Sequence, residues 1–164
     1  MRNIDDFFLI ADNAGVRLEI IDGLPVWEAL PNLTHQEAID RIRQTFQGPG
    51  GAGDACGCLH YADLHIKFPD GSDMRPDISV FCKRPCETES AVTEVPKAVI
   101  EILSKGYEKK DLDLGPPFYL AQGVQDVIVH DPYTGMVRHF DGSGVRGYQS
   151  PIGLSLHCGC HVTV

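Results

Sequence analysis

A glutamate stands in the middle of an otherwise apolar segment of this chain. Residues 98–103 read AVIEIL, which is apolar on both alternating faces except at Glu101, as in a central strand covered on both sides. Asp77 poses the same puzzle, because it begins a second apolar segment directly after Pro76. Burying an ionised carboxylate without a partner is costly. Each residue therefore needs compensation, from a buried basic side chain, a shifted pKa or a bound cation.

Two carboxylates on neighbouring strands can share one hard divalent cation. Mg²⁺ is usually held by one or two protein carboxylates, while water and substrate phosphate complete its coordination shell. A cation so placed stabilises charge on a phosphodiester during hydrolysis. We therefore predict that Asp77 and Glu101 bind Mg²⁺, for which Mn²⁺ can substitute. The alternatives are that Glu101 pairs with a buried arginine or lies at the end of its strand.

The elements that would position these residues follow from local patterns. Residues 17–21 alternate apolar and polar side chains, and Asp22 with Gly23 is a tight-turn dipeptide, so we expect a hairpin near the start of the chain. Thr34 and Glu37 have the spacing of a capping box, which predicts a helix capped by Thr34. The hairpin and the helix would precede both carboxylates.

Further strands are predicted at residues 63–68, 77–82, 98–103 and 126–130, a short helix at 118–122 ended by Gly123, a hairpin turn at 141–144, and last strands near 147 and 154–158. The glycine-rich segment 47–58 predicts a loop. Strands interrupted by two helices indicate an α/β (α+β) fold with a mixed sheet. We expect one domain over residues 1–164.

Composition narrows the functional classes. With 23 acidic and 14 basic residues, the chain has a net charge of -9, which excludes broad electrostatic adhesion to nucleic acid. Contact with DNA would have to come from a local patch. No run of eighteen apolar residues and no signal peptide is visible, so we expect a soluble cytoplasmic protein that does not enter a membrane.

Six cysteines in a reducing compartment are expected to be thiols. They also raise the question of zinc, since thiolate and imidazole are its preferred ligands. Structural zinc sites usually use pairs separated by two to four residues, and only Cys82 with Cys86 has that spacing. The spacing therefore argues against zinc, and small buried thiols packed in the core are the favoured interpretation.

Taken together, the sequence resembles the Uma family, a bacterial group with a restriction-endonuclease-like fold related to the PD-(D/E)xK nucleases. The resemblance rests on segments in matching order: 18–23, Pro31 with His35, 75–77, 99–104, Asp111, 119–124 and 130–132. It implies a central mixed sheet flanked by helices, DNA as the substrate, and a metal bound by Asp77 and Glu101. It also implies a supporting role for Glu19 at the edge of the site. Taken alone, Glu19 alternates with apolar neighbours and would be an exposed strand residue.

The chain departs from related nucleases at the catalytic lysine. Those enzymes place a lysine two residues after the glutamate, a position occupied here by Leu103. Members of this family commonly carry a lysine four residues after the aspartate that matches Asp111, and that position here is Gly115. Because Pro116 and Pro117 follow, we expect that no helix runs through this point.

Three nearby lysines, Lys105, Lys109 and Lys110, are candidates to replace the missing ammonium. The first hypothesis is a Mg²⁺-dependent endonuclease that hydrolyses DNA phosphodiester bonds, with a homodimer able to cut both strands. The alternative is a catalytically degenerate relative that binds DNA or a protein. That alternative is favoured by the absence of a lysine at positions 103 and 115 and by the net negative charge of the chain.

Overall fold

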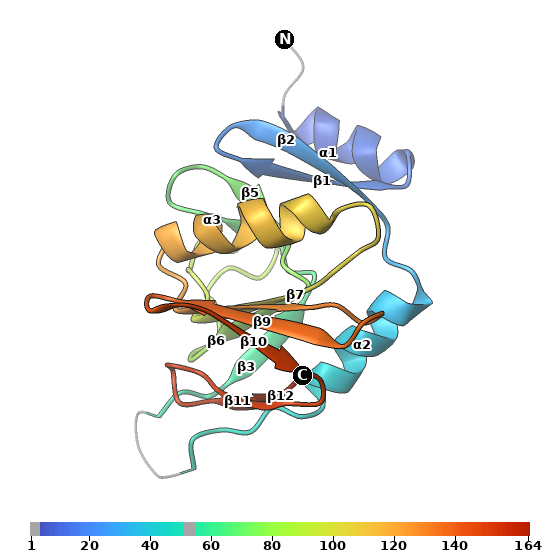
Figure 1. The fold of residues 1–164 in the computed structure, drawn as a ribbon. Helices are drawn as coiled ribbons and strands as arrows, with labels where there is room; N and C mark the ends of the chain where they lie inside the picture. The colour runs from blue at the N-terminus through green and yellow to red at the C-terminus, as the bar shows by residue number, and fades with distance from the viewer. Residues whose placement is uncertain (1–3, 51–54) are drawn as a thin grey trace.

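A computed structural model describes residues 4–50 and 55–164 of the chain (Figure 1). Its helical elements are α1 (Ile4–Asn13), α2 (Leu33–Arg43), the π-helical turn η1 (Lys110–Leu114) and α3 (Gly115–Ala121). Its strands are β1 (Val16–Ile21), β2 (Leu24–Ala29), β3 (Leu59–Ala62), β4 (Ile66–Lys67), β5 (Asp73–Met74), β6 (Ile78–Phe81), β7 (Ala98–Ile102), β8 (Asp126–His130), β9 (Met136–Asp141), β10 (Gly144–Gln149), β11 (Gly153–Ser155) and β12 (His161–Thr163). None of the helices in the described part of the chain has both the length and the apolar content needed to cross a bilayer.

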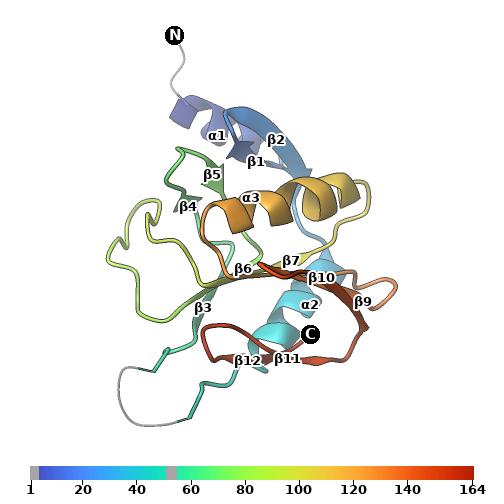
Figure 2. The same cartoon turned by 60° about the vertical axis from the view of Figure 1, so that its left-hand side comes forward.

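A six-stranded sheet in the order β10-β9-β8-β7-β6-β3 forms the centre of the fold. Strands β7 and β8 are parallel and the other neighbours are antiparallel, so the predicted mixed sheet is confirmed. A second sheet has the order β2-β1-β5-β4, and β11 pairs with β12 as a small hairpin. In Figures 1 and 2, α3 lies between the β1–β2 hairpin and the central sheet.

The two faces of the central sheet pack against different elements. On one face, Ile100 joins a core made with α2 and the β11–β12 hairpin. On the other face, Val99 joins a core that contains Phe118 and Tyr119 of α3. Side chains alternate along a strand, so Glu101 points to the same face as Val99. The polar residue that stood out in the sequence therefore faces α3.

The predicted hairpin at the start of the chain is confirmed, but the predicted cap of α2 is wrong. Asp22 and Gly23 have φ values of 51° and 75°, the left-handed conformation that a two-residue hairpin turn requires. The helix is capped by Asn32 in place of Thr34, because the Asn32 side chain accepts a hydrogen bond of 3.0 Å from the backbone N–H of His35. An asparagine caps as well as a threonine, so the helix begins two residues earlier than the capping box suggested.

The other predicted helices, strands and loops are confirmed in part. The helix before Gly123, the strand at 126–130 and the hairpin around 141–144 are present. The single strand expected at 63–68 is wrong, since only residues 66–67 of that range pair in a sheet. Helix α1 was missed, although Ile4, Phe7, Phe8 and Ala11 have helical spacing, because the consecutive apolar residues 7–10 mask that period. The predicted loop at 47–58 has no helix or regular strand where it is described, and residues 51–54 lie outside the described residues.

The prediction that all six cysteines are thiols is wrong for four of them. Cys56 pairs with Cys82 and Cys58 pairs with Cys160, whereas the other two cysteines are free. The Cα atoms of the two pairs are 4.1 Å and 5.8 Å apart. The paired cysteines are 26 and 102 residues apart in the sequence, so the sequence did not predict that they are neighbours. The central sheet and the β11–β12 hairpin bring them together.

Candidate active site

The two carboxylates singled out in the sequence lie side by side on the face of the central sheet that α3 covers. Asp77 immediately precedes β6, and Glu101 lies in the neighbouring strand β7. The Asp77 backbone N–H donates to Oε2 of Glu101 over 3.2 Å, and the Ile102 N–H donates to Oδ2 of Asp77 over 2.8 Å. Both residues are buried, with 3% and 1% of their surface exposed. The structure thus brings the predicted pair together.

Asp77 is held as an anion by two basic groups. Nη1 of Arg17 lies 3.3 Å from its Oδ1, and Nε2 of His35 lies 3.1 Å from its Oδ2. Burial raises the pKa of Asp77, but the hydrogen bond from His35 and the charge of Arg17 outweigh it and hold the pKa at about 2. Asp77 therefore stays ionised at neutral pH and offers a permanent negative charge.

Glu101 is in the opposite electrostatic situation. Burial and the charge of Asp77 raise its pKa well above the ordinary value, against the opposing charge of Lys110. The hydroxyl of Tyr119 donates to Oε1 of Glu101 over 2.7 Å. Burial and the charge of Glu101 raise the pKa of Tyr119 as well, so the phenol keeps its proton. Glu101 therefore takes up a proton much more readily than Asp77 does.

Glu19 extends the site from strand β1. One of its oxygens, Oε1, accepts a hydrogen bond of 2.8 Å from the Arg75 backbone N–H. The other, Oε2, lies 2.7 Å from Nζ of Lys110, which is also 3.5 Å from Oδ1 of Asp111. Glu19 is only 1% exposed. The interpretation of Glu19 as an exposed strand residue is therefore wrong.

The three candidate lysines are placed very differently. Lys110 is buried and lies within the carboxylate cluster, whereas Lys105 and Lys109 are exposed. Nζ of Lys105 sits 4.3 Å from the ring centre of Tyr133, in a cation–π contact. Of the three, the structure therefore brings Lys110 to the carboxylates and leaves the other two in solvent.

The turn that carries Lys110 also corrects an expectation about the prolines. The helical backbone does run through residues 110–121, because the N–H of Gly115 donates to the carbonyl of Lys110 and closes a wide π-helical turn. Pro116 and Pro117 fall in the first turn of α3, where a helix does not need their missing N–H groups. The wide turn buries Lys110 and Asp111 together.

Carboxylates outnumber the cations in this cluster. Seven titratable side chains, each 5% exposed or less, belong to it: Arg17, Glu19, His35, Asp77, Glu101, Lys110 and Asp111. Four are carboxylates, two are permanent cations, and His35 adds a positive charge when its ring is protonated beside Asp77. A proton on Glu101 or a divalent cation would offset the remaining negative charge. An oxygen-rich set of buried carboxylates is the donor set that Mg²⁺ and Mn²⁺ prefer, so these residues fit such an ion.

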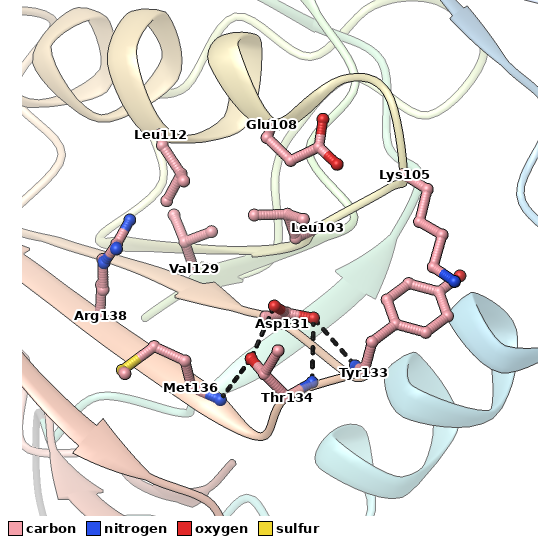
Figure 3. A pocket seen from close by; sticks show the side chains of 10 residues that line it. All are labelled: Leu103, Lys105, Glu108, Leu112, Val129, Asp131, Tyr133, Thr134, Met136 and Arg138. Atoms are coloured by element: carbon pink, nitrogen blue, oxygen red, sulfur yellow. Dashed lines mark hydrogen bonds between the residues drawn. The ribbon is translucent and has the colours of Figure 1, made fainter.

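A pocket of about 470 Å³ opens next to this cluster but does not contain it (Figure 3). Leu103, two residues beyond Glu101, lines its floor, and Lys105 leans on Tyr133 at one end while Arg138 stands at the other. The buried carboxylates are absent from its lining. Leu103 thus contributes to an apolar hollow and offers no charge at the position where related nucleases carry a lysine.

A second buried polar group lies elsewhere in the fold. The Asp126 carboxylate, fully buried, accepts hydrogen bonds from Nε2 of His139 over 2.8 Å and from the backbone N–H of His157 over 2.8 Å. Nδ1 of His157 also lies 2.9 Å from Oδ1 of Asp126. Burial raises the pKa of Asp126, but the hydrogen bonds from the two histidines outweigh it and lower the pKa. This group ties β8 to β9 and to the segment before β12.

Sequence reasoning missed three residues of the site. Arg17 precedes Glu19 by two positions, so the period of a strand could have placed both on one face. His35 was named only among the residues that carry the family resemblance, without a role at the site. Tyr119 belongs to an apolar helix face in the sequence, and nothing there predicts that its hydroxyl reaches Glu101.

Comparisons with known proteins agree with this fold. The family model that matches residues 4–155 is Uma2, described as "Putative restriction endonuclease". A crystal structure from Anabaena variabilis, described as a "putative nuclease belonging to DUF820", superposes with a TM-score of 0.67. It is 18% identical, and the match covers 97% of this chain and 91% of that one, which shows a shared fold. A search of curated proteins finds no match. The predicted family and fold class are confirmed, and the family match supports a nuclease function.

Proposed function

Since the chain belongs to the Uma2 family of restriction-endonuclease-like proteins, we propose that it is a Mg²⁺-dependent endonuclease that hydrolyses DNA phosphodiester bonds at Asp77 and Glu101. The observation that carries this proposal is the buried excess of carboxylates beside a buried ammonium, Lys110. Even with His35 protonated, three cations face four carboxylates. Because an uncompensated buried carboxylate destabilises the fold, a bound cation would stabilise this site.

Each side chain of the cluster has a role that its contacts support. Asp77 and Glu101 would hold the divalent cation, which supplies Lewis-acid stabilisation of charge on the phosphate. Arg17 and His35 fix the orientation and the charge of Asp77. Glu101 would release its proton when the cation binds, because a carboxylate must be deprotonated to act as a metal ligand.

Lys110 would serve the reacting phosphate. Its ammonium is held by Glu19 over 2.7 Å, so Glu19 positions the lysine in this proposal and does not touch the substrate. An ammonium in a buried site stabilises developing negative charge more strongly than one in water, because the surroundings screen it less. The exposed Lys105 would contact the DNA backbone, because DNA binding by so acidic a protein needs cations at its surface.

The competing proposal is a non-catalytic relative that binds DNA or a protein. It rests on Leu103 and Gly115, which stand where related nucleases carry a lysine. The burial of Lys110 in the carboxylate cluster weakens that argument, because an ammonium is present from a different element. A dead relative would also have no reason to keep four carboxylates out of water.

The test is nicking of supercoiled plasmid DNA with Mg²⁺ or Mn²⁺. We expect Asp77→Asn, Glu101→Gln and Lys110→Met to lose activity by about 100-fold or more, as when an electrostatic stabiliser of a transition state is removed. Lys109→Met is the matched control, because this neighbouring lysine is exposed, and it should retain most of the activity. Activity that survives in Glu101→Gln and Lys110→Met would come from elsewhere and would refute the assignment.

A homodimer is part of the proposal, since two copies of the site would cut both strands. Sedimentation in the presence of a short DNA duplex measures this directly. We expect two chains per duplex. In the plasmid assay, we expect linear product to appear soon after the nicked form. A single chain per duplex, with only nicked product, would restrict the protein to single-strand cleavage.

A further inference from the structure

Five of the six cysteines gather at the end of the molecule where the β11–β12 hairpin lies. Cys56 and Cys58 precede β3, Cys82 follows β6, and Cys158 and Cys160 lie in the turn between β11 and β12. In Figures 1 and 2 the β11–β12 hairpin and α1 with β1 are at opposite ends. Cys58 and Cys160 belong to the core on the α2 face of the central sheet, whereas Glu101 faces α3. The sulfur cluster is therefore independent of the candidate active site.

The sulfur atoms form two compact trios that share Cys56. The Sγ atoms of Cys56, Cys58 and Cys160 all lie within 4.8 Å of one another, and so do those of Cys56, Cys82 and Cys158. Sγ of Cys56 is 3.6 Å from Sγ of Cys160, although these two residues are not bonded to each other. The two disulfides use four sulfurs, and the fifth, Cys158, lies in the second trio with its thiol free. Two disulfides need only four cysteines, so the fifth cysteine of this cluster has no role in the disulfides.

We propose that in its reduced form this cluster binds a zinc ion through the thiolates of Cys56, Cys58 and Cys160, with Cys82 or Cys158 as the fourth ligand. A Zn–S bond is about 2.3 Å long, so the sulfurs of a tetrahedral site are about 3.8 Å apart. The separation of 3.6 Å between Cys56 and Cys160 is close to that edge, and a limit of 4.8 Å bounds the distances among Cys56, Cys58 and Cys160. The fourth sulfur lies within 4.8 Å of Cys56 and would move toward the other two once the disulfides are reduced.

The backbone around the cluster is shaped for close approach. The N–H of Gly57 donates to the Cys82 carbonyl over 2.9 Å, and a Cβ at Gly57 would lie 2.9 Å from that same oxygen. Gly159, between the other two cysteines of the turn, has a φ of +90°, which favours glycine. Both Cys-Gly-Cys segments thus need their glycine to bring the flanking sulfurs together. This local geometry explains how cysteines only two residues apart can serve a site for which their sequence spacing is unusual.

The same sulfurs cannot be bonded in pairs and bind zinc as thiolates. Each disulfide needs one phosphine and one water to become two thiols and a phosphine oxide, and each thiol releases a proton when it binds the ion. Cys58 and Cys160 are buried, 7% and 0% exposed, so the site is closed and structural in type. With Cys82 as the fourth ligand, the ion would join the segment before β3 and the β11–β12 hairpin to the end of β6, the connection that the two disulfides make in the oxidised chain.

The test is the zinc content of protein purified without a metal-affinity tag and reduced with a phosphine. We expect about one zinc ion per chain, the stoichiometry of a four-thiolate site. Cys58→Ser and Cys160→Ser should lose the ion, whereas Cys86→Ser, the matched control at an exposed free cysteine, should keep it. Protein oxidised to the disulfide form should bind none. Reduced wild-type protein without zinc, or full zinc content in Cys58→Ser, would overturn the proposal.

A spectroscopic arm covers the case in which a serine variant does not fold. Reduced wild-type protein loaded with Co²⁺ should show intense thiolate-to-cobalt charge-transfer bands and the visible bands of a tetrahedral ion. Glu101→Gln should give the same spectrum, because the sulfur cluster is separate from the carboxylates. A weak spectrum typical of octahedral oxygen ligands, or one lost in Glu101→Gln, would place the metal elsewhere and refute the thiolate site.

Discussion

The substitution of Lys110 by methionine probes the charge balance of the buried cluster without a nuclease assay. Methionine keeps the length and the apolar stem of the side chain but removes the ammonium that lies 2.7 Å from Glu19. The cluster then has four carboxylates and one permanent cation, Arg17. Glu19 loses its nearest cation while its other oxygen remains bonded to the Arg75 N–H. The variant therefore creates an uncompensated buried charge.

The size of the effect follows from the burial of both partners. Lys110 and Glu19 are 5% and 1% exposed, so water does not replace the lost partner. Removing one member of a buried ion pair costs about 3–5 kcal/mol, a large share of the total stability of about 5–15 kcal/mol of a typical domain. Lys109→Met, at an exposed neighbour, should change the stability by less than about 0.5 kcal/mol.

Urea denaturation followed by circular dichroism measures both variants in buffer without divalent ions. A third variant, Lys110→Met with Glu19→Gln, removes both charges and should recover most of the loss, since replacing both partners is much less costly than orphaning one. The cycle then yields a coupling energy of about 0.5–3 kcal/mol, the range for residues in contact. Equal midpoints for Lys110→Met and Lys109→Met, or a double variant no better than Lys110→Met, would refute the buried pair.

Three further outcomes follow from the structure. Glu101→Gln should fold without metal, because glutamine resembles the protonated acid, but it should lose the stabilisation by Mg²⁺, which in wild-type protein reaches about 2.7 kcal/mol at a hundredfold excess over Kd; thermal unfolding with and without Mg²⁺ shows whether it does. Tyr119→Phe removes a donor of 2.7 Å to Glu101 and should cost about 1.5–3 kcal/mol in urea. The pKa of Asp126 is lowered in the folded protein, so its contribution to stability is present above its ordinary pKa of 3.8 and is lost as pH falls. Asp126→Asn should therefore flatten the acid limb of the stability curve, and an unchanged limb would contradict this.

The sequence predicted the parts of the fold that local patterns determine. The first hairpin follows from Asp22 with Gly23, and the buried strands follow from apolar segments with bounds close to those observed. The two carboxylates were also predictable, because an acid between apolar neighbours is unusual wherever the strand lies. These predictions needed only the sequence neighbours of each residue.

The partners of the carboxylates could not be predicted, because they come from distant elements. Arg17 is 60 residues from Asp77, and Tyr119 is 18 residues from Glu101 in another element. A basic or hydroxyl side chain is compatible with solvent as well as with a buried site, so its type alone decides nothing. The prediction that the cysteines are thiols was wrong for the same reason, because disulfide pairing depends on which strands and turns are neighbours in the fold.

The missing lysine shows that a site is defined by positions in space and not by positions along the chain. A lysine two residues after Glu101 would enter from the end of β7, where Leu103 now lines an apolar pocket. Lys110 reaches the cluster from η1, a π-helical turn closed by the hydrogen bond from the Gly115 N–H to the Lys110 carbonyl. The two prolines that follow lie in the first turn of α3, where the helix does not need backbone N–H donors. We infer that the residues which seemed to disable the enzyme, Gly115 and the prolines after it, are the ones that shape the turn carrying its ammonium. Replacing Gly115 by lysine should then leave the nicking activity unchanged or lower it, because the existing ammonium already occupies the site.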